Sequence, residues 1–384
     1  MMRDTPTDGA APRVCARMRI HAERKEKIAT VLRREYSRHG SYMKTDIKSM
    51  LLDELREYFS SIGEKAFRAE QVFKWLHGGA VTFAEMTNLP EKLRAGLDAE
   101  FFINVPSLAK KQVSKDDGTV KYLWRMNDGE AVESVLMEYE HGKTVCISTQ
   151  AGCRMGCAFC ASTLGGLSRN LTASEMEDQV LFTQIDSGQR ISNIVLMGIG
   201  EPLDNFDKVI RFLQLVTHES GMNISARRIS LSTCGIIENI DKLAEYDIKL
   251  TLTVSLHAPD DDTRSGIMPV NRRTGVDNLL ETCRRYFSHT GRRVSYEYAM
   301  IHGVNDSPQQ AALLADKLKN TGSHLNLILL NDVPEQPMVA SYRDDIKTFT
   351  DILKQKGVNF TIRRKLGGDI EASCGQLRRR EGFS

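Results

Sequence analysis

Short apolar runs and amphipathic stretches alternate along the chain after Lys143. Six runs rich in Val, Ile and Leu are each followed by a stretch with apolar residues at helical spacing. The runs lie at 144–149, 191–200, 228–235, 249–257, 293–301 and 325–330. The amphipathic stretches are Ala173–Asp186, Asn205–His218, Ile236–Tyr246, Val276–Ser288, Pro308–Asn320 and Ser341–Lys356. This alternation predicts an α/β fold with a parallel sheet and crossover helices. Six such units and a closing strand at 359–364 predict a partial (β/α) barrel.

The region before the barrel has two different patterns. Apolar positions recur at helical spacing in Met50–Tyr58, Ala66–Leu76 and Pro90–Phe101, separated by Gly and Pro. Residues 105–140 instead alternate apolar and polar positions on either side of Asn127-Asp128-Gly129, a hairpin turn sequence. The sequence therefore predicts a helical accessory domain at 43–104, a β-hairpin connection at 105–142, the catalytic barrel at 143–376 and a basic tail at 377–384.

The first 42 residues lack a sustained apolar period. Residues 1–44 hold 11 Lys and Arg against five Asp and Glu, whereas the rest of the chain holds 41 and 45. Two interpretations stay open: residues 1–42 are an extension ahead of a true start at Met43, or they form a flexible basic arm.

Overall charge does not indicate a polyanionic partner, because 52 Lys and Arg balance 50 Asp and Glu. No run approaches the roughly 18 apolar residues of a membrane helix, and no secretory signal opens the chain. We therefore expect a cytoplasmic protein without membrane attachment, and a monomer. Eight cysteines in such a chain favour metal or thiol chemistry over a disulfide scaffold.

The strand ends of the predicted barrel are candidate binding positions, since ligands bind at the carboxyl ends of parallel strands. Each end is polar or rich in glycine where the apolar run stops. These ends read Gly198-Ile199-Gly200-Glu201, Ser232-Thr233-Cys234-Gly235, Ser255-Leu256-His257 and Asn331.

Three cysteines, Cys153, Cys157 and Cys160, follow the first strand at C-x3-C-x2-C spacing. A closed 4Fe-4S cluster takes four cysteine thiolates, so three leave one iron open. An open iron can bind the amino and carboxylate groups of S-adenosylmethionine (SAM), which is cleaved to a radical after one-electron reduction. A zinc site with its fourth ligand elsewhere is the alternative, although zinc sites more often use paired CxxC or Cys/His spacing.

Several longer motifs resemble the RlmN/Cfr family of radical SAM RNA methyltransferases. The motifs are CISTQAGCRMGCAFCASTLGGLSRNLTASE, MGIGEPLDN, SLHAPDDDTRSGIMPVNRR, GVNDS and GGDIEASCGQL. The resemblance runs from about Met43 to Arg380, and 63–90 looks like the family's N-terminal accessory domain, a candidate RNA contact. It implies a radical SAM barrel and RNA methylation with two SAM molecules per turnover.

The RlmN type, which the sequence resembles more than Cfr, implies methylation of adenosine carbon 2. The substrates implied are 23S rRNA, in the peptidyl-transferase region, and tRNA, beside the anticodon. An electron donor such as flavodoxin or ferredoxin is implied as well. Two alternatives remain: Cfr-type methylation of carbon 8 in 23S rRNA, and a non-catalytic iron-sulfur or zinc RNA-binding protein.

The resemblance also implies roles for individual residues. Cys374 would accept a methyl group, Cys146 would form a disulfide with Cys374 to resolve the RNA adduct, and Glu133 would accept a proton. The SAM-contacting positions implied are Gly200, Glu201, Ser232, Ser255, Leu256, His257 and Asn331. Without the resemblance, a strand cysteine such as Cys146 is usually a small buried hydrophobe, and Glu133 a solvated carboxylate. We interpret Cys15, Cys234 and Cys283 as structural.

Arginine clusters are candidate phosphate contacts, because RNA binding draws on Lys and Arg. Two of them, Arg363-Arg364 and Arg378-Arg379-Arg380, lie close to Cys374 in sequence. The target base would have to be unstacked to reach the cysteines.

Overall fold

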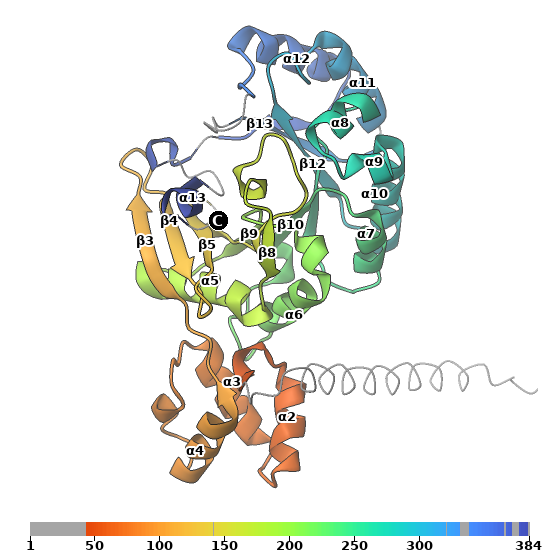
Figure 1. Ribbon diagram of the computed structural model, residues 1–384. Helices are drawn as coiled ribbons and strands as arrows, with labels where there is room; N and C mark the ends of the chain where they lie inside the picture. The colour runs from red at the N-terminus through yellow and green to blue at the C-terminus, as the bar shows by residue number, and fades with distance from the viewer. Residues whose placement is uncertain are drawn as a thin grey trace, which may run out of the picture. The chain divides into compact units, whose positions relative to one another are not determined.

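A ten-stranded mixed sheet is the central element of the computed structural model (Figure 1). The structure describes residues 44–140, 142–319, 321–330, 338–364, 366–370 and 376–382. In their order across the sheet, the strands are β14 (Phe360–Ile362), β13 (His324–Leu329), β12 (Val294–Met300), β11 (Thr251–Ser255), β10 (Ile229–Thr233), β9 (Asn193–Leu196), β6 (Gly142–Cys146), β5 (Ala131–Tyr139), β4 (Val120–Arg125) and β3 (Ser107–Val113). Neighbours from β6 to β14 are parallel, and neighbours from β3 to β6 are antiparallel.

Helices follow the parallel strands as the periodicity predicts. They are α5 (Ala173–Ser187), α6 (Phe206–Thr217), α7 (Ile237–Ala244), α10 (Val276–Thr290), α11 (Pro308–Leu318) and α12 (Arg343–Gln355). The predicted α/β class and partial barrel of six units are confirmed. Two short helices, α8 (Asp261–Ile267) and α9 (Asn271–Thr274), precede α10, and neither has an apolar period that would have predicted it. A last helix, α13 (Gln376–Arg380), lies near the C-terminus.

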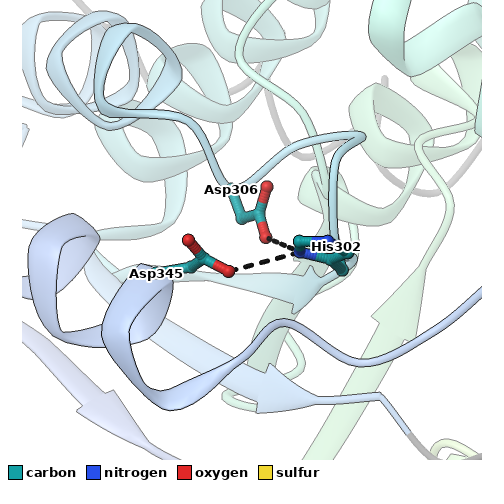
Figure 2. A group of neighbouring side chains, drawn as sticks. All are labelled: His302, Asp306 and Asp345. Atoms are coloured by element: carbon teal, nitrogen blue, oxygen red, sulfur yellow. Dashed lines mark ion pairs between the residues drawn. The ribbon is translucent and has the colours of Figure 1, made fainter.

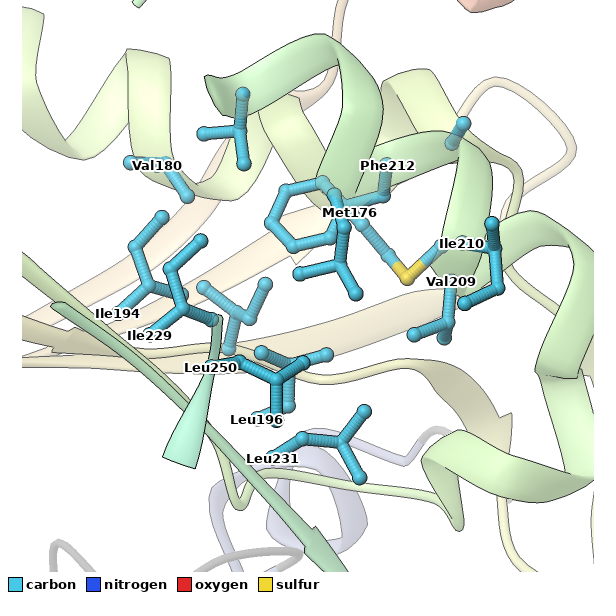
Figure 3. Close-up of a cluster of buried hydrophobic side chains, with 14 of the residues drawn as sticks. Met176, Val180, Ile194, Leu196, Val209, Ile210, Phe212, Ile229, Leu231 and Leu250 are labelled. Carbon is cyan, nitrogen blue, oxygen red and sulfur yellow. The ribbon is translucent and has the colours of Figure 1, made fainter. Parts of the chain in front are cut away.

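The helix-covered face of the sheet holds the main apolar core (Figure 3). Alternate residues of β9 and β10, among them Ile194 and Leu231, point toward α5 and α6 and are buried. Met176 of α5 and Phe212 of α6 fill the space above them. Each large apolar side chain buried in this way contributes roughly 1.5–3 kcal/mol to folding, so this core fixes the barrel strands against their helices.

The third strand of the antiparallel extension, β3, was not expected from the sequence. β3 is the edge strand, and its residues are exposed on both faces apart from the half-buried Gln112. Such a strand needs no alternation of apolar and polar residues, so its sequence lacks the usual signal.

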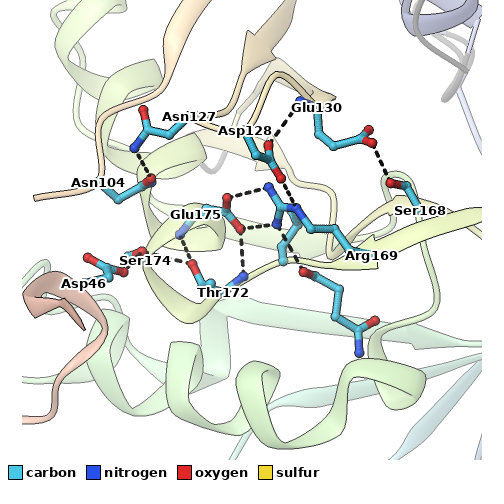
Figure 4. A network of polar contacts seen from close by, with 12 residues as sticks. Asp46, Asn104, Asn127, Asp128, Glu130, Ser168, Arg169, Thr172, Ser174 and Glu175 are labelled. Carbon is cyan, nitrogen blue, oxygen red and sulfur yellow. Dashed lines mark hydrogen bonds and ion pairs between the residues drawn. The ribbon is translucent and has the colours of Figure 1, made fainter. Parts of the chain in front are cut away.

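Arg169 joins the hairpin extension to the barrel (Figure 4). It lies on β8 (Leu167–Asn170), which pairs with β7 (Gln150–Gly152) in a separate two-stranded sheet. Its guanidinium donates two 2.8 Å hydrogen bonds to Glu175 of α5 and another to Asp128 of the β4–β5 turn. Thr172 and Glu175 also form a capping box that begins α5.

The N-terminal helical module contains the three helices that the periodicity predicts. They are α2 (Leu52–Ser61), α3 (Phe67–His77) and α4 (Glu91–Glu100), flanked by the short strands β1 (Thr45–Asp46) and β2 (Phe101–Phe102). Leu55, Phe59, Phe73 and Leu76 are fully buried in its core. No helix in the described part of the chain is both long and apolar enough to span a membrane.

A buried ion pair and a buried histidine–carboxylate contact attach this module to α5. Lys48 pairs with Asp178, and His77 Nδ1 lies 2.7 Å from Glu177 Oε1. All four side chains are fully buried. Burial raises the pKa of Asp178 to about 7, although Lys48 opposes the shift. Residues 46–384 accordingly form one compact unit.

Candidate active site

Polar residues line one face of the ten-stranded sheet. Alternate side chains along a strand face opposite sides, and residues paired across two strands face the same side. The pairs Cys146–Val195 and Ser255–Glu297 therefore place Cys146 and Glu297 opposite the apolar core. We call this side the inner face. Its polar members include Lys121, Glu133, Cys146, Ser232, Ser255, Glu297 and Asn326.

The three clustered cysteines lie on the loop that follows β7. Gly152 begins this loop with φ +79°, and a Cβ atom there would lie 2.0 Å from the carbonyl oxygen of Gly166. That close approach lets the backbone N–H of Cys153 donate to the Gly166 carbonyl at 2.8 Å. Cys160 N–H donates to the Cys157 carbonyl at 3.1 Å, which folds the rest of the loop tightly. Glycine at position 152 is therefore required by the loop.

A pocket of about 300 Å³ opens between the cysteine loop and the strand ends. It brings together the three cysteines and five of the seven SAM-contacting positions that the resemblance implies. Its lining includes Cys153, Cys157, Cys160, Gly200, Glu201, Ser232, Ser255 and His257. Residues that are distant in sequence thus share one cavity, as the barrel topology predicts.

Glu201 connects the ends of β9 and β10. Its Oε1 accepts the N–H of Leu203 at 3.0 Å, and its Oε2 accepts the N–H of Cys234 at 2.7 Å. Burial raises the pKa of Glu201, and these hydrogen bonds oppose the shift. The side chains of Thr233 and Cys234 also hydrogen-bond to this carboxylate, so Glu201 is a rigid, negatively charged anchor in the pocket wall.

His257 ends the next strand with a left-handed backbone, φ 56°. Its Nδ1 accepts the N–H of Ala299 at 2.9 Å, which leaves Nε2 to carry the proton of a neutral ring. Burial, assisted by the charge of Arg264, lowers the pKa of His257 to about 3. The ring also makes an edge contact with Phe159 of the cysteine loop, 4.9 Å between centroids. His257 is therefore a rigid, neutral donor in the pocket wall.

The cysteine thiols fit an iron-sulfur cluster better than a single zinc ion. Zinc holds sulfur at about 2.3 Å, so its ligands lie close together. Among the described residues, only His302, Asp306 and Asp345 bring three ligand atoms within 4.8 Å of one another; the three cysteines do not. Burial raises the pKa of Cys153 to about 12 and also raises that of Cys157, so a cationic group is needed to hold them as thiolates.

Glu133 is buried on the inner face at 3% exposure, which contradicts the solvated alternative. Its Oε2 lies 3.0 Å from Nζ of the fully buried Lys121. Its Oε1 accepts the backbone N–H of Arg378 at 2.6 Å. Leu377 packs beside them on Leu123 and Ala131, so α13 covers this part of the inner face.

Comparison with known proteins agrees with this geometry. A radical SAM superfamily model matches residues 147–315, and a model described as the ribosomal RNA large subunit methyltransferase N-terminal domain matches 45–103. A protein of Lachnoclostridium phytofermentans named probable dual-specificity RNA methyltransferase RlmN is 50% identical over 337 residues, 88% of this chain and 95% of that protein. The protein of the same name from Alkaliphilus oremlandii is 48% identical over 88% of this chain and 98% of its own length. The chain belongs to the RlmN family of radical SAM methyltransferases.

A solved structure supports the same assignment. The crystal structure of a radical SAM methyltransferase from Sphaerobacter thermophilus is 42% identical, with a TM-score of 0.82, and covers 86% of this chain and 98% of its own. The resemblance inferred from the motifs is confirmed. This RlmN-family chain is a SAM-dependent methyltransferase that uses a 4Fe-4S cluster and SAM.

Not every predicted site residue of this RlmN-family chain lines the pocket. Leu256 is fully buried behind the pocket wall, with its N–H donated to the Glu297 carbonyl at 3.0 Å. Cys146 is the last residue of β6, on the inner face between β5 and β9. Asn331 and Cys374 lie outside the described residues, as do Cys15 and the rest of residues 1–43.

The structure adds Glu297 to the pocket, which the sequence analysis missed. It also places in the lining Arg363, a candidate phosphate contact, and Cys234, part of a candidate strand end. Glu297 of β12 lines the pocket, and its carboxylate accepts hydrogen bonds from Asn326 at 3.1 Å and Arg363 at 3.3 Å. Arg363 thus points into the pocket, where it also contacts the Met197 sulfur at 3.5 Å. Cys234, interpreted as structural, lines the same pocket. The local sequence does not show that these side chains line a pocket. Only their position in the tertiary structure shows it.

A second group of titratable residues lies outside the pocket of this RlmN-family chain (Figure 2). His302 Nδ1 lies 3.2 Å from Asp345 and 3.5 Å from Asp306. Both oxygens of Asp306 already accept hydrogen bonds, from Gly303 N–H at 3.0 Å and Ser341 Oγ at 2.7 Å. These bonds connect the loop after β12 to the residues just before α12. The three side chains therefore have a structural role.

Proposed function

We propose that this chain methylates carbon 2 of adenosine in 23S rRNA and in tRNA. The peptidyl-transferase region and the position beside the anticodon are the proposed sites. The relatives named dual-specificity RNA methyltransferases support this proposal, since they match the chain over nearly their whole length. One observation carries it: the three cysteines share a pocket with Glu201, Ser255 and His257, while Glu133 and Cys146 lie on the same face of the sheet.

The pocket residues would hold the two cofactors. Cys153, Cys157 and Cys160 would bind three irons of the cluster as thiolates. When bound, the cluster and SAM supply a deoxyadenosyl radical. Glu201 would accept the ammonium group of SAM, and its two backbone hydrogen bonds hold the carboxylate in place for this. Gly200, Ser232, Ser255, His257 and Asn331 would complete the SAM site, and Leu256 would support its wall from behind.

Cys374 would carry the methyl group. Its sulfur would take a methyl from a first SAM, lose one hydrogen atom from that methyl, and bond through the remaining methylene carbon to the adenine. The segments on either side, 366–370 and 376–382, are both fastened to the antiparallel extension. Gly367 N–H donates to Asp117 at 2.8 Å, and Arg378 N–H donates to Glu133 at 2.6 Å.

Glu133 and Cys146 would complete the reaction. Glu133 would accept the proton that leaves the methylated carbon. Cys146 would then form a disulfide with Cys374 as the Cys374–carbon bond breaks. The released carbon would take up a proton to become the methyl group, and the remaining unpaired electron would leave to the electron carrier proposed below, which frees the RNA. Both residues face the same side of neighbouring strands, because Val135 pairs with Cys146 and lies two positions from Glu133.

The partners of the enzyme follow from this chemistry. We propose that a flavodoxin or ferredoxin supplies electrons and that the chain acts as a monomer. Its proposed RNA substrates place it in the cytoplasm. The helical module at 45–103 is the proposed additional RNA contact.

Nucleoside mass spectrometry tests the proposed function. A strain lacking the enzyme is complemented with this chain, with Cys374→Ala, or with Cys283→Ala, which removes a buried thiol outside the pocket. We expect 2-methyladenosine in rRNA and tRNA with the natural chain and with Cys283→Ala, and none with Cys374→Ala. Formation of 8-methyladenosine instead would establish the carbon-8 activity and overturn the proposal.

A further inference from the structure

Arg264 of α8 is completely buried behind the pocket wall. Its Nη2 donates to the carbonyls of Cys234 at 2.7 Å and Ser255 at 2.9 Å. Its Nε donates to the carbonyl of Leu256 at 2.9 Å, and its Nη1 donates to Asn271 Oδ1 at 2.8 Å. One guanidinium thus joins the ends of β10 and β11, the two strands that present Ser232 and Ser255.

All four acceptors around Arg264 are neutral. No carboxylate in the described part of the chain forms an ion pair with it. The carboxylate of Asp261 reaches it only through Asn271, whose amide donates to Asp261 Oδ1 at 2.9 Å. Burying a charge without a counter-ion is costly, and hydrogen bonds to carbonyls offset only part of that cost. The folded chain therefore holds a buried positive charge with no carboxylate in direct contact, and Asp261 acts on it only from behind Asn271.

This charge lies directly behind the cysteine loop. Ala158 of that loop donates its N–H to the carbonyl of Ile267, the last residue of α8, at 2.9 Å. Ile267 belongs to the apolar cluster on which Cys157 and Phe159 pack. Cys234, whose carbonyl Arg264 binds, lines the pocket with the three cysteines.

We propose that Arg264 is the built-in counter-charge of the cysteine site: its guanidinium stabilises the negative charge of a cluster held by Cys153, Cys157 and Cys160 and favours one-electron reduction there. This inference rests on the assignment of the three cysteines in the proposed function. It names Arg264 as a positioning residue, since nothing places it against substrate.

A positive charge near the cysteine site should raise the reduction potential of a cluster held there. Reduction adds one electron, taken from a one-electron reductant such as dithionite, and no proton, so the site becomes more negative by one charge. A positive charge fixed in a low-dielectric interior stabilises the more negative state and raises the reduction potential. If Arg264 only joined the ends of β10 and β11, it would not raise the reduction potential. Measuring the reduction potential therefore distinguishes an electrostatic role of Arg264 from a purely structural one.

Redox titration of the anaerobically reconstituted enzyme tests the proposal. We expect Arg264→Gln to shift the one-electron equilibrium about tenfold toward the oxidised state, ~59 mV to lower potential. Arg264→Lys keeps a positive charge with fewer hydrogen bonds and should shift it much less. The matched control is Arg273→Gln, which removes an exposed arginine charge from α9 and should leave the potential unchanged.

A second variant decides the question if Arg264→Gln does not fold. The exchange Asp261→Asn with Asn271→Asp keeps the net charge and moves the carboxylate into contact with Arg264. It should lower the potential as Arg264→Gln does. An unchanged reduction potential in folded, iron-loaded Arg264→Gln or in the folded, iron-loaded exchange variant would overturn the proposal. Equal shifts in Arg264→Gln and Arg264→Lys would also overturn it. If the natural chain itself binds no cluster at these cysteines, the proposed function fails instead.

Discussion

The carboxylate of Glu133 accepts the backbone N–H of Arg378 at 2.6 Å while its other oxygen lies 3.0 Å from Lys121. The first contact fastens α13 to β5, and the second places a positive charge beside the carboxylate. The proposed proton acceptor is thus also a structural anchor for the segment that follows Cys374. A substitution at position 133 must therefore be tested for stability and turnover separately.

We expect Glu133→Gln to reduce methylation by about 10²- to 10⁴-fold, the usual range for loss of a general base. It should also lower the free energy of unfolding by roughly 3–5 kcal/mol, because the buried Lys121 ammonium loses this carboxylate. The amide oxygen can still accept the Arg378 N–H. Turnover is measured by nucleoside mass spectrometry, and stability by denaturant unfolding.

The double variant Lys121→Met/Glu133→Gln separates these two effects. Removing both charges should restore most of the lost stability and none of the turnover. Recovery of methylation in the double variant would mean that Glu133 acts only as a partner for Lys121.

Gly152→Ala should prevent cluster binding. The new Cβ would lie 2.0 Å from a backbone oxygen of Gly166, at a φ of +79°. Gly166→Ala is the matched control, because Gly166 has a similar φ of +69° and nothing within 4 Å of its Cβ position. The control should cost about 1–2 kcal/mol of stability and keep its iron. Iron and sulfide analysis after reconstitution compares the two, and equal iron contents would contradict the expected clash.

His257 should make the apoprotein less stable in acid. Its folded pKa is about 3 against an ordinary value of 6.5, since burial disfavours the charged ring. Between these two values the unfolded chain binds a proton that the folded chain does not, so stability falls as the pH is lowered. The slope in the middle of this window is about 1.4 kcal/mol per pH unit.

His257→Asn should remove this contribution to the pH dependence. Asparagine tolerates the positive φ of 56° and can accept the Ala299 N–H. Unfolding free energies at several pH values compare it with the natural chain and with His289→Asn, an exposed control. Parallel pH profiles for all three proteins would show that His257 does not titrate as expected.

Substitutions of the two proposed catalytic cysteines, Cys146 and Cys374, should fail in different ways. Cys374→Ala lacks the methyl-accepting sulfur, so we expect no methylated RNA and no covalent adduct. Cys146→Ala still forms the adduct but cannot resolve it, so we expect enzyme bound covalently to RNA. Denaturing gel electrophoresis with labelled RNA shows the adduct. A fully active Cys374→Ala enzyme would refute the scheme.

The main strands and helices could be predicted because each apolar run is buried against helices and bounded by polar residues. The strand-end residues could be placed together because parallel strands end at one edge of a sheet. Glu201, Ser232, Ser255 and His257 meet in the pocket accordingly. The edge strand β3 lacks an apolar face, and its residues therefore carried no comparable signal.

The arginines show what could not be predicted. Arg264 stands beside three aspartates in DDDTRSG, a composition typical of a solvated helix, and only the tertiary structure places it under two strand ends. Arg378 was a candidate phosphate contact, yet it is 4% exposed and donates to Glu130 at 2.9 Å. Which arginine of a run faces inward depends on the surface against which the helix packs, and the local sequence does not contain that information.

Successive side chains of β5 face opposite sides of the sheet, so inserting one residue and inserting two residues in this strand have different effects. Glu133 faces α13, whereas its neighbour Ser134 faces the opposite side, where it accepts the Trp124 indole N–H at 2.8 Å. A one-residue insertion in β5 that shifted its pairing would put a serine at the active face and push the carboxylate into the apolar core. A two-residue insertion would restore the side but not the register. Only insertions outside the strands leave Glu133 on the active face in its present register. Natural variation in length should therefore fall in the turns of this hairpin rather than within its strands.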